Sequence, residues 1–132
     1  MELFLAAPDA IQIHIATVLV AVAMTLIILP LRKGTGLHRI AGWVWVVSMM
    51  TTAIVSLWIH EFDTPYWFSW IHIFSAVVIF NVPYAIWAIR RGDISGHRNA
   101  MIGLSLGGIG IAGFFAMQRG RLMWDILFTG AV

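Results

Sequence analysis

Four long apolar runs constrain this chain more than any other feature of its sequence. They cover residues 10–31, 40–59, 66–89 and 100–117. A run of about 20 apolar residues spans the hydrocarbon core of a bilayer as a helix. Of the 132 residues, 61% are hydrophobic and 11% are charged, whereas a soluble domain carries about 25% charged residues. The sequence therefore predicts an all-α integral membrane protein, one four-helix bundle over residues 1–132 with no second domain.

The two ends of the sequence and the absence of cysteine further limit the kind of membrane protein that this chain can be. The chain begins with an acid, Glu2, instead of a basic segment, so it does not resemble a cleaved signal peptide. Residues 119–132 are amphipathic and predict a short C-terminal helix along the membrane interface. The sequence contains no cysteine, which excludes disulfides, iron–sulfur clusters, thiolate nucleophiles and covalent c-type haem.

Basic residues predict the orientation of the helices. They cluster at the first and third connections, at Arg32, Lys33, Arg39, Arg90, Arg91 and Arg98, whereas the second connection has none. The positive-inside rule then places both basic loops, 32–39 and 90–98, in the cytoplasm and both termini outside, as in a multi-pass protein of the bacterial inner membrane. Tryptophans are expected to mark the inner interface at Trp43, Trp45 and Trp87, and the outer one at Trp58, Trp67, Trp70 and Trp124.

Residues 13–39 and 71–98 resemble each other. Both begin with Ile-His-Ile and end with His-Arg, and the matched pairs are His14 with His72, Arg32 with Arg90, Gly34 with Gly92, His38 with His97, and Arg39 with Arg98. The match predicts a duplicated helical hairpin, with repeat one at about 10–60 and repeat two at about 66–118. An axis along the membrane normal would relate the two repeats.

The repeat predicts two separate histidine pairs. His14 lies near one membrane face and His38 near the other, because residues 14 to 31 alone span about 26 Å of helix. His14 is therefore expected to meet His72 on the outer side, and His38 to meet His97 on the inner side. Histidine at such positions is uncommon in membrane spans and favours a functional role.

Paired imidazoles are typical axial ligands of low-spin b-type haem. Small residues leave room for the macrocycle, and the sequence offers Gly103, Gly107 and Gly110 on one helix and Gly42, Thr52 and Ser56 on another. Arg39 and Arg98, beside the inner histidines, are suited to pair with haem propionates. Two haems on opposite faces would form an electron path across the membrane, with quinone as a possible reaction partner.

Two resemblances accompany this interpretation. The motifs "GTGLHRIAGW" (34–43) and "GDISGHRNAM" (92–101) resemble an uncharacterised bacterial family of predicted membrane proteins, the DUF2306 type, and the likeness covers most of the chain. The layout of two histidine pairs in one bundle is similar to the core of cytochrome b561-type di-haem proteins. That second likeness implies haem at His14 with His72 and at His38 with His97.

Other interpretations stay open. His38 and His97 with their arginines can anchor helix starts to lipid phosphates, and the glycines can serve helix packing. The chain would then be a cofactor-free accessory subunit of a larger respiratory or photosynthetic complex, or would form a homo-oligomer. A third possibility is a zinc or copper site at the outer face formed by His14, His60 and His72 with nearby acids. No nucleophile elbow or paired zinc-binding motif points to a hydrolase, and nothing points to nucleic acid.

Overall fold

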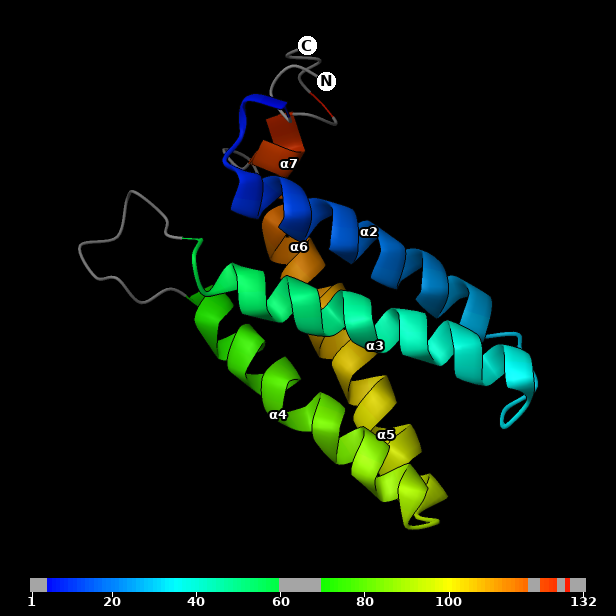
Figure 1. Ribbon diagram of the computed structural model, residues 1–132. Helices are drawn as coiled ribbons and strands as arrows, with labels where there is room; N and C mark the ends of the chain where they lie inside the picture. Colours follow the sequence, from blue (N-terminus) through cyan, green and yellow to red (C-terminus); the bar gives the residue numbers. More distant parts are fainter. Residues whose placement is uncertain (1–4, 60–69, 119–121, 126–127, 129–132) are drawn as a thin grey trace.

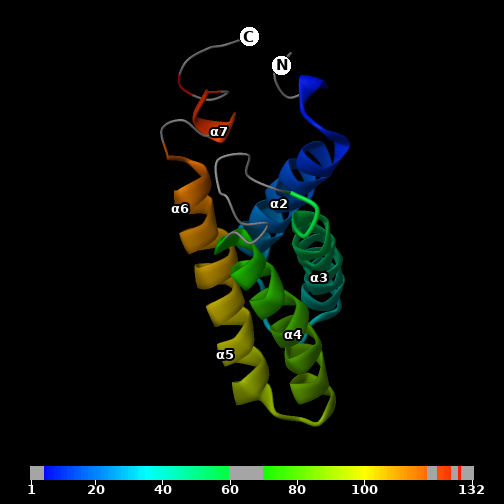
Figure 2. The ribbon, with the colours of Figure 1, turned by 90° about the vertical axis from the view of Figure 1, so that its left-hand side faces the viewer.

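The computed structural model describes residues 5–59, 70–118, 122–125 and 128. Within these residues the regular elements are all helical, namely α2 (Asp9–Ile28), α3 (Gly36–Ser56), α4 (Trp70–Arg90), α5 (Ile94–Leu104), the π-helix η1 (Ser105–Ile111), α6 (Ala112–Ala116) and α7 (Leu122–Trp124). Helices α5, η1 and α6 follow one another as a single rod (Figure 2). Counting that rod once, the described residues contain four helices that are long and apolar enough to cross a membrane. The predicted all-α four-helix bundle is confirmed.

The bundle consists of two antiparallel hairpins. Helix α2 packs along α3, and α4 packs along α5. The hairpins meet where α3 packs on α4 (Figures 1 and 2). The turns from α2 to α3 and from α4 to α5 lie at one end of the bundle, and α2 begins at the same end at which α6 finishes. All six basic residues of the predicted inner face therefore lie at one end.

The two turns at the basic end have matching geometry. Gly34 and Gly92 both have φ of +82°, a left-handed conformation that glycine adopts without a steric penalty. Each is followed by an N-cap, because the Thr35 hydroxyl accepts a hydrogen bond from the His38 N–H and the Asp93 carboxylate accepts one from the Gly96 N–H. These caps let α3 and α5 begin at Gly36 and Ile94, earlier than residues 40 and 100 expected from hydropathy.

The helical rod of the second hairpin contains a π-helix that hydropathy did not predict. Within η1, a Cβ on Gly108 would lie 3.0 Å from Met49 Cε and 3.6 Å from Val78 Cγ2, so this glycine allows close approach to α3 and α4. A Cβ on Gly103 or Gly107 would meet nothing within 4 Å. A π-turn shifts the face that a helix presents, and the packing face therefore differs from the one expected from glycine spacing.

The core lies at the junction of the hairpins. It is formed by Ala21, Trp45, Met49, Ala53, Val78, Val82 and Leu104. The expectation that Trp45 marks the inner interface is wrong, because its side chain is only 1% exposed. Its indole Nε1–H donates a hydrogen bond of 2.8 Å to Thr25 Oγ1, which satisfies the polar end of the ring inside the bundle.

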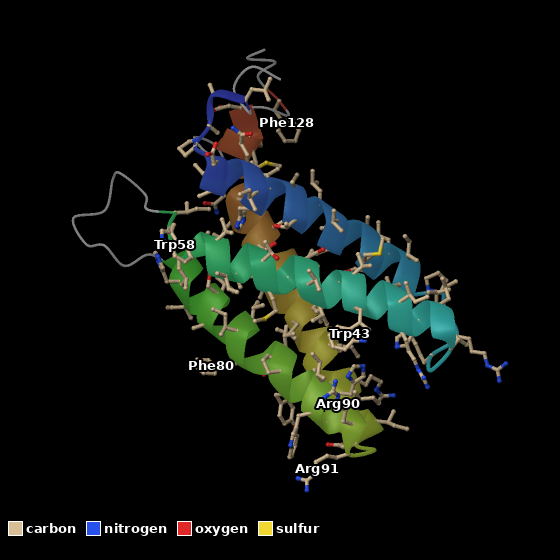
Figure 3. All side chains as sticks on the ribbon, viewed as in Figure 1. Trp43, Trp58, Phe80, Arg90, Arg91 and Phe128 are labelled. Atoms are coloured by element: carbon tan, nitrogen blue, oxygen red, sulfur yellow. The ribbon has the colours of Figure 1, made fainter. Side chains whose placement is uncertain are left out.

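The outward faces of the helices are apolar. Large side chains such as Trp43, Trp58 and Phe80 are at least half exposed, and Figure 3 shows Phe80 pointing away from the bundle. A soluble protein rarely leaves so much contiguous apolar surface in water. The exposed faces suit a lipid environment, as the four apolar helices require.

Candidate functional site

The end of the bundle opposite the basic turns contains a buried polar cluster between α2 and α3. Ser56 is 2% exposed, and its hydroxyl donates a hydrogen bond of 2.7 Å to the carbonyl oxygen of Thr52. The Ser56 oxygen lies 2.8 Å from His14 Nδ1. Next along the helices, Thr17 Oγ1 and Thr52 Oγ1 are 2.7 Å apart. The contacts of His14 with Ser56 and of Thr17 with Thr52 join α2 to α3.

The Ser56 contact fixes the protonation pattern of the His14 ring. A serine hydroxyl has one proton to donate, and Ser56 gives it to the Thr52 carbonyl. Ser56 must therefore accept a hydrogen bond from His14, which places a proton on His14 Nδ1. In the neutral ring Nε2 then carries the lone pair, so the His14 ring offers Nε2 as a ligand atom.

His72, the expected partner of His14, lies near the start of α4 and is half-buried. The interhelical hydrogen bond of the His14 ring runs to Ser56 on α3. The pairing of His14 with His72 stays a prediction.

At the basic end, His97 is held in the same way as His14. Its Nδ1 lies 3.0 Å from the carbonyl oxygen of Ala85 on α4. A carbonyl oxygen only accepts, so His97 Nδ1 carries the proton, and in the neutral ring Nε2 is the free ligand atom. The hydrogen bond also joins α5 to α4, just as the His14 bond joins α2 to α3.

His38 is the expected partner of His97, and the two residues lie in the first turns of α3 and α5 at the basic end of the bundle. Their pairing stays a prediction. Among the described residues, His38 Nδ1 is the one buried side-chain nitrogen or oxygen without a hydrogen-bond partner. Such an atom is costly to leave unpaired, so His38 has an unused polar group at the basic end of the bundle.

The remaining predicted site residues follow His38 and His97 in sequence, or are glycines on α3, α5 and η1. Arg39 and Arg98 directly follow His38 and His97 in sequence and are exposed. Open space, with no atom within 4 Å of an added Cβ, surrounds Gly42, Gly103 and Gly107. Arg39 and Arg98 are therefore exposed cations next in sequence to the two histidines, and the three glycine positions are uncovered.

The predicted outer metal site falls partly outside the described residues. His60, Glu61 and Asp63 belong to the segment that the structure does not describe. Within the described ranges no group of three or more His, Cys, Asp or Glu side chains lies close enough to hold a metal ion. The site of His14, His60 and His72 stays a prediction.

Sequence reasoning missed the role of the polar side chains on α3. Ser56 and Thr52 were expected to serve as small neighbours of a macrocycle, but both are buried hydrogen-bonding groups. The sequence does contain a pattern that indicates this role. Ser48, Thr52 and Ser56 recur every four residues and so share one helix face. Small polar residues with this spacing are typical of a helix–helix interface in a membrane.

Comparison with known proteins gives one result. A family model described as "Predicted membrane protein (DUF2306)" matches residues 11–114. Neither the curated proteins nor the solved structures contain a match.

Proposed function

Because the chain belongs to the DUF2306 family of predicted membrane proteins, we propose a function within the bilayer: it is a b-type haem protein that passes electrons. The observation that supports this proposal is that His14 and His97 have the same hydrogen-bonding pattern at their rings. Each donates its Nδ1–H to a protein oxygen at 2.8–3.0 Å, and each keeps Nε2 available. Histidines that ligate iron are commonly oriented in this way by their second ring nitrogen.

The inner pair offers the more complete ligand set. His97 has its ring fixed by Ala85, and His38 has a buried ring nitrogen without a partner. His38 on α3 and His97 on α5 would hold a haem through their neutral imidazoles. Arg39 and Arg98 are exposed at the same end, where they suit the propionates. The residues present therefore fit haem, which when bound would supply one-electron redox chemistry.

The residues of this chain would perform the supporting tasks. Ser56 and Ala85 orient the imidazoles and raise their basicity by accepting the Nδ1–H bonds. The apolar core around Trp45 excludes water from the path between the two ends of the bundle. Electrons would pass between the end bearing His38 and His97 and the end bearing His14, with quinone as a candidate exchange partner in the membrane.

An absorption spectrum tests the proposal. The protein is purified from cells supplied with haem precursor, and the expected result is a sharp α band on reduction. His97→Ala should abolish the inner haem, whereas Asn99→Ala, an exposed change two residues away on another face of α5, should leave the spectrum intact. A protein that is folded and colourless, and that takes up no haem on titration, would refute the proposal.

A cofactor-free accessory subunit is the second candidate function. The observation that favours it is the low burial of two helices, α2 and the rod over Ile94–Ala116. Only 6% of the most apolar stretch of each is buried inside the bundle, against 39% for α3. Two uncovered helices suit docking to other subunits of a respiratory or photosynthetic complex, or to a second copy. Cross-linking in intact membranes distinguishes the candidates, because a subunit would be recovered in one defined complex without haem.

A further inference from the structure

A groove runs between α3 and α4 on the outside of the bundle. Its volume is about 360 Å³, and it is lined by Val46 and Met50 on α3 and by Val82, Pro83, Trp87 and Arg90 on α4. All of these side chains except Arg90 are apolar. The groove is separate from the histidine pairs and was not apparent from the sequence.

The length of the groove matches one leaflet of a bilayer. From Val82 to Arg90 the α4 helix rises about 12 Å. The apolar half-thickness of a membrane is about 15 Å. The apolar part of the groove therefore begins near the middle of the membrane, and its charged end lies at the basic face of the bundle.

Arg90 and Arg91 differ in what they contact. The Arg91 guanidinium lies 4.8 Å from the centre of the Trp87 ring, a cation–π contact. In the described part of the chain, no ion pair engages Arg90. Figure 3 shows Arg90 on the side of α4 that faces α3, and Arg91 pointing away from the bundle. Arg90 therefore leaves a guanidinium at the mouth of an apolar groove.

We propose that this groove binds one anionic phospholipid, with an acyl chain along Val46, Met50 and Pro83 and the phosphate on Arg90. The apolar lining suits the chain, and the guanidinium suits a phosphate, which it can bind through two parallel hydrogen bonds. Free phosphate would leave the apolar lining unused, and a neutral quinone head would leave the arginine charge unpaired. The complementary chemistry favours a lipid that is both apolar and anionic.

Native mass spectrometry of the protein released from micelles tests the proposal. The probes are palmitoyl-oleoyl phosphatidylglycerol and the matching phosphatidylcholine at equal concentration. We expect the wild type to retain one phosphatidylglycerol with roughly fivefold preference, the effect of about one arginine at a membrane surface. Arg90→Gln should lose that preference, whereas Arg32→Gln, which removes the same charge from the other basic turn, should keep it.

A second variant tests the acyl-chain part of the groove. Val46→Phe should reduce the retention of both lipids severalfold and leave the ratio between them unchanged, because it fills the apolar part and spares Arg90. Equal losses in Arg90→Gln and Arg32→Gln would show that only general surface charge attracts lipid, and would overturn the proposal. Displacement of the retained lipid by an equal concentration of a long-chain quinone, or by inorganic phosphate, would also overturn it.

Discussion

The hydrogen bond between Trp45 and Thr25 joins α3 to α2, and its contribution to the stability of the first hairpin can be measured directly. Trp45 is 1% exposed, and its Nε1–H lies 2.8 Å from Thr25 Oγ1. The Thr25 hydroxyl gives its own proton to the Ala21 carbonyl at 2.8 Å, so its lone pair is available to the indole. Thr25→Val keeps the shape of the side chain but removes this acceptor.

The expected cost follows from what is lost. A hydrogen bond between transmembrane helices contributes about 0.6 kcal/mol on average and up to about 1.7 kcal/mol. A buried donor left without a partner costs about 1–3 kcal/mol. Because the Trp45 ring is enclosed on all sides, water cannot replace the lost acceptor. We therefore expect Thr25→Val to lower the free energy of unfolding by about 1.5 kcal/mol.

The assay is reversible unfolding in lipid bicelles, followed by far-ultraviolet circular dichroism. Thr25→Ser serves as the matched control, since it keeps the hydroxyl and loses only a methyl group. The Trp45→Phe background removes the donor, and there Thr25→Val should cost less than about 0.5 kcal/mol. An equal cost of Thr25→Val in both backgrounds would refute the reasoning, because it would show that the two side chains are not coupled.

Three further predictions concern packing, capping and orientation. Gly108→Leu should lower the free energy of unfolding by about 1–3 kcal/mol because its side chain would collide with Met49, whereas Gly113→Leu, in open space, should be nearly neutral in the same assay. Asp93→Ala should cost about 1 kcal/mol by removing the cap of α5, and an unchanged stability would contradict that role. Ser95→Cys should react with a membrane-impermeant maleimide only from the cytoplasmic side. The chain has no other cysteine to confuse this result, and labelling of intact cells from outside would reverse the predicted topology.

The sequence predicts the spans because their cause is local. Twenty apolar residues in a row must be helical in a bilayer, whatever surrounds them. The helix starts were less predictable. Thr35 and Asp93 cap α3 and α5, so both helices begin before their apolar runs, and hydropathy does not detect such caps. The position of Trp45 was missed because its burial depends on Thr25, which lies on another helix.

The candidate site was predicted only in part. The repeat predicts that His38 and His97 lie at the same end of the bundle, and the structure has α3 and α5 begin there. The pairing of their rings stays a prediction. The hydrogen bonds of His14 and His97 run to Ser56 and Ala85 on neighbouring helices. These contacts depend on helix rotation, and helical periodicity does not determine rotation when every face of a helix is apolar.

The two hairpins match in sequence but are held together differently. Counting on from the matched His38 and His97, Ser56 corresponds to Phe115 and Thr52 corresponds to Ile111. The polar residues of hairpin one therefore align in sequence with apolar residues of hairpin two, where the His97 bond to a backbone carbonyl joins α4 to α5.

This asymmetry has a consequence for the proposed haem ligands. By the same correspondence, the serine that fixes the His14 ring aligns with Phe115, so this serine is not repeated in the second hairpin. A ligand that donates its Nδ1–H to an oxygen is more basic than one that does not. In a haem held by His14 and His72, Ser56→Ala should therefore raise the midpoint potential, because it removes the bond that favours the ferric state. Potentiometric titration against wild type measures the shift, and an unchanged potential in a folded, haem-loaded variant would show that His14 is not an axial ligand.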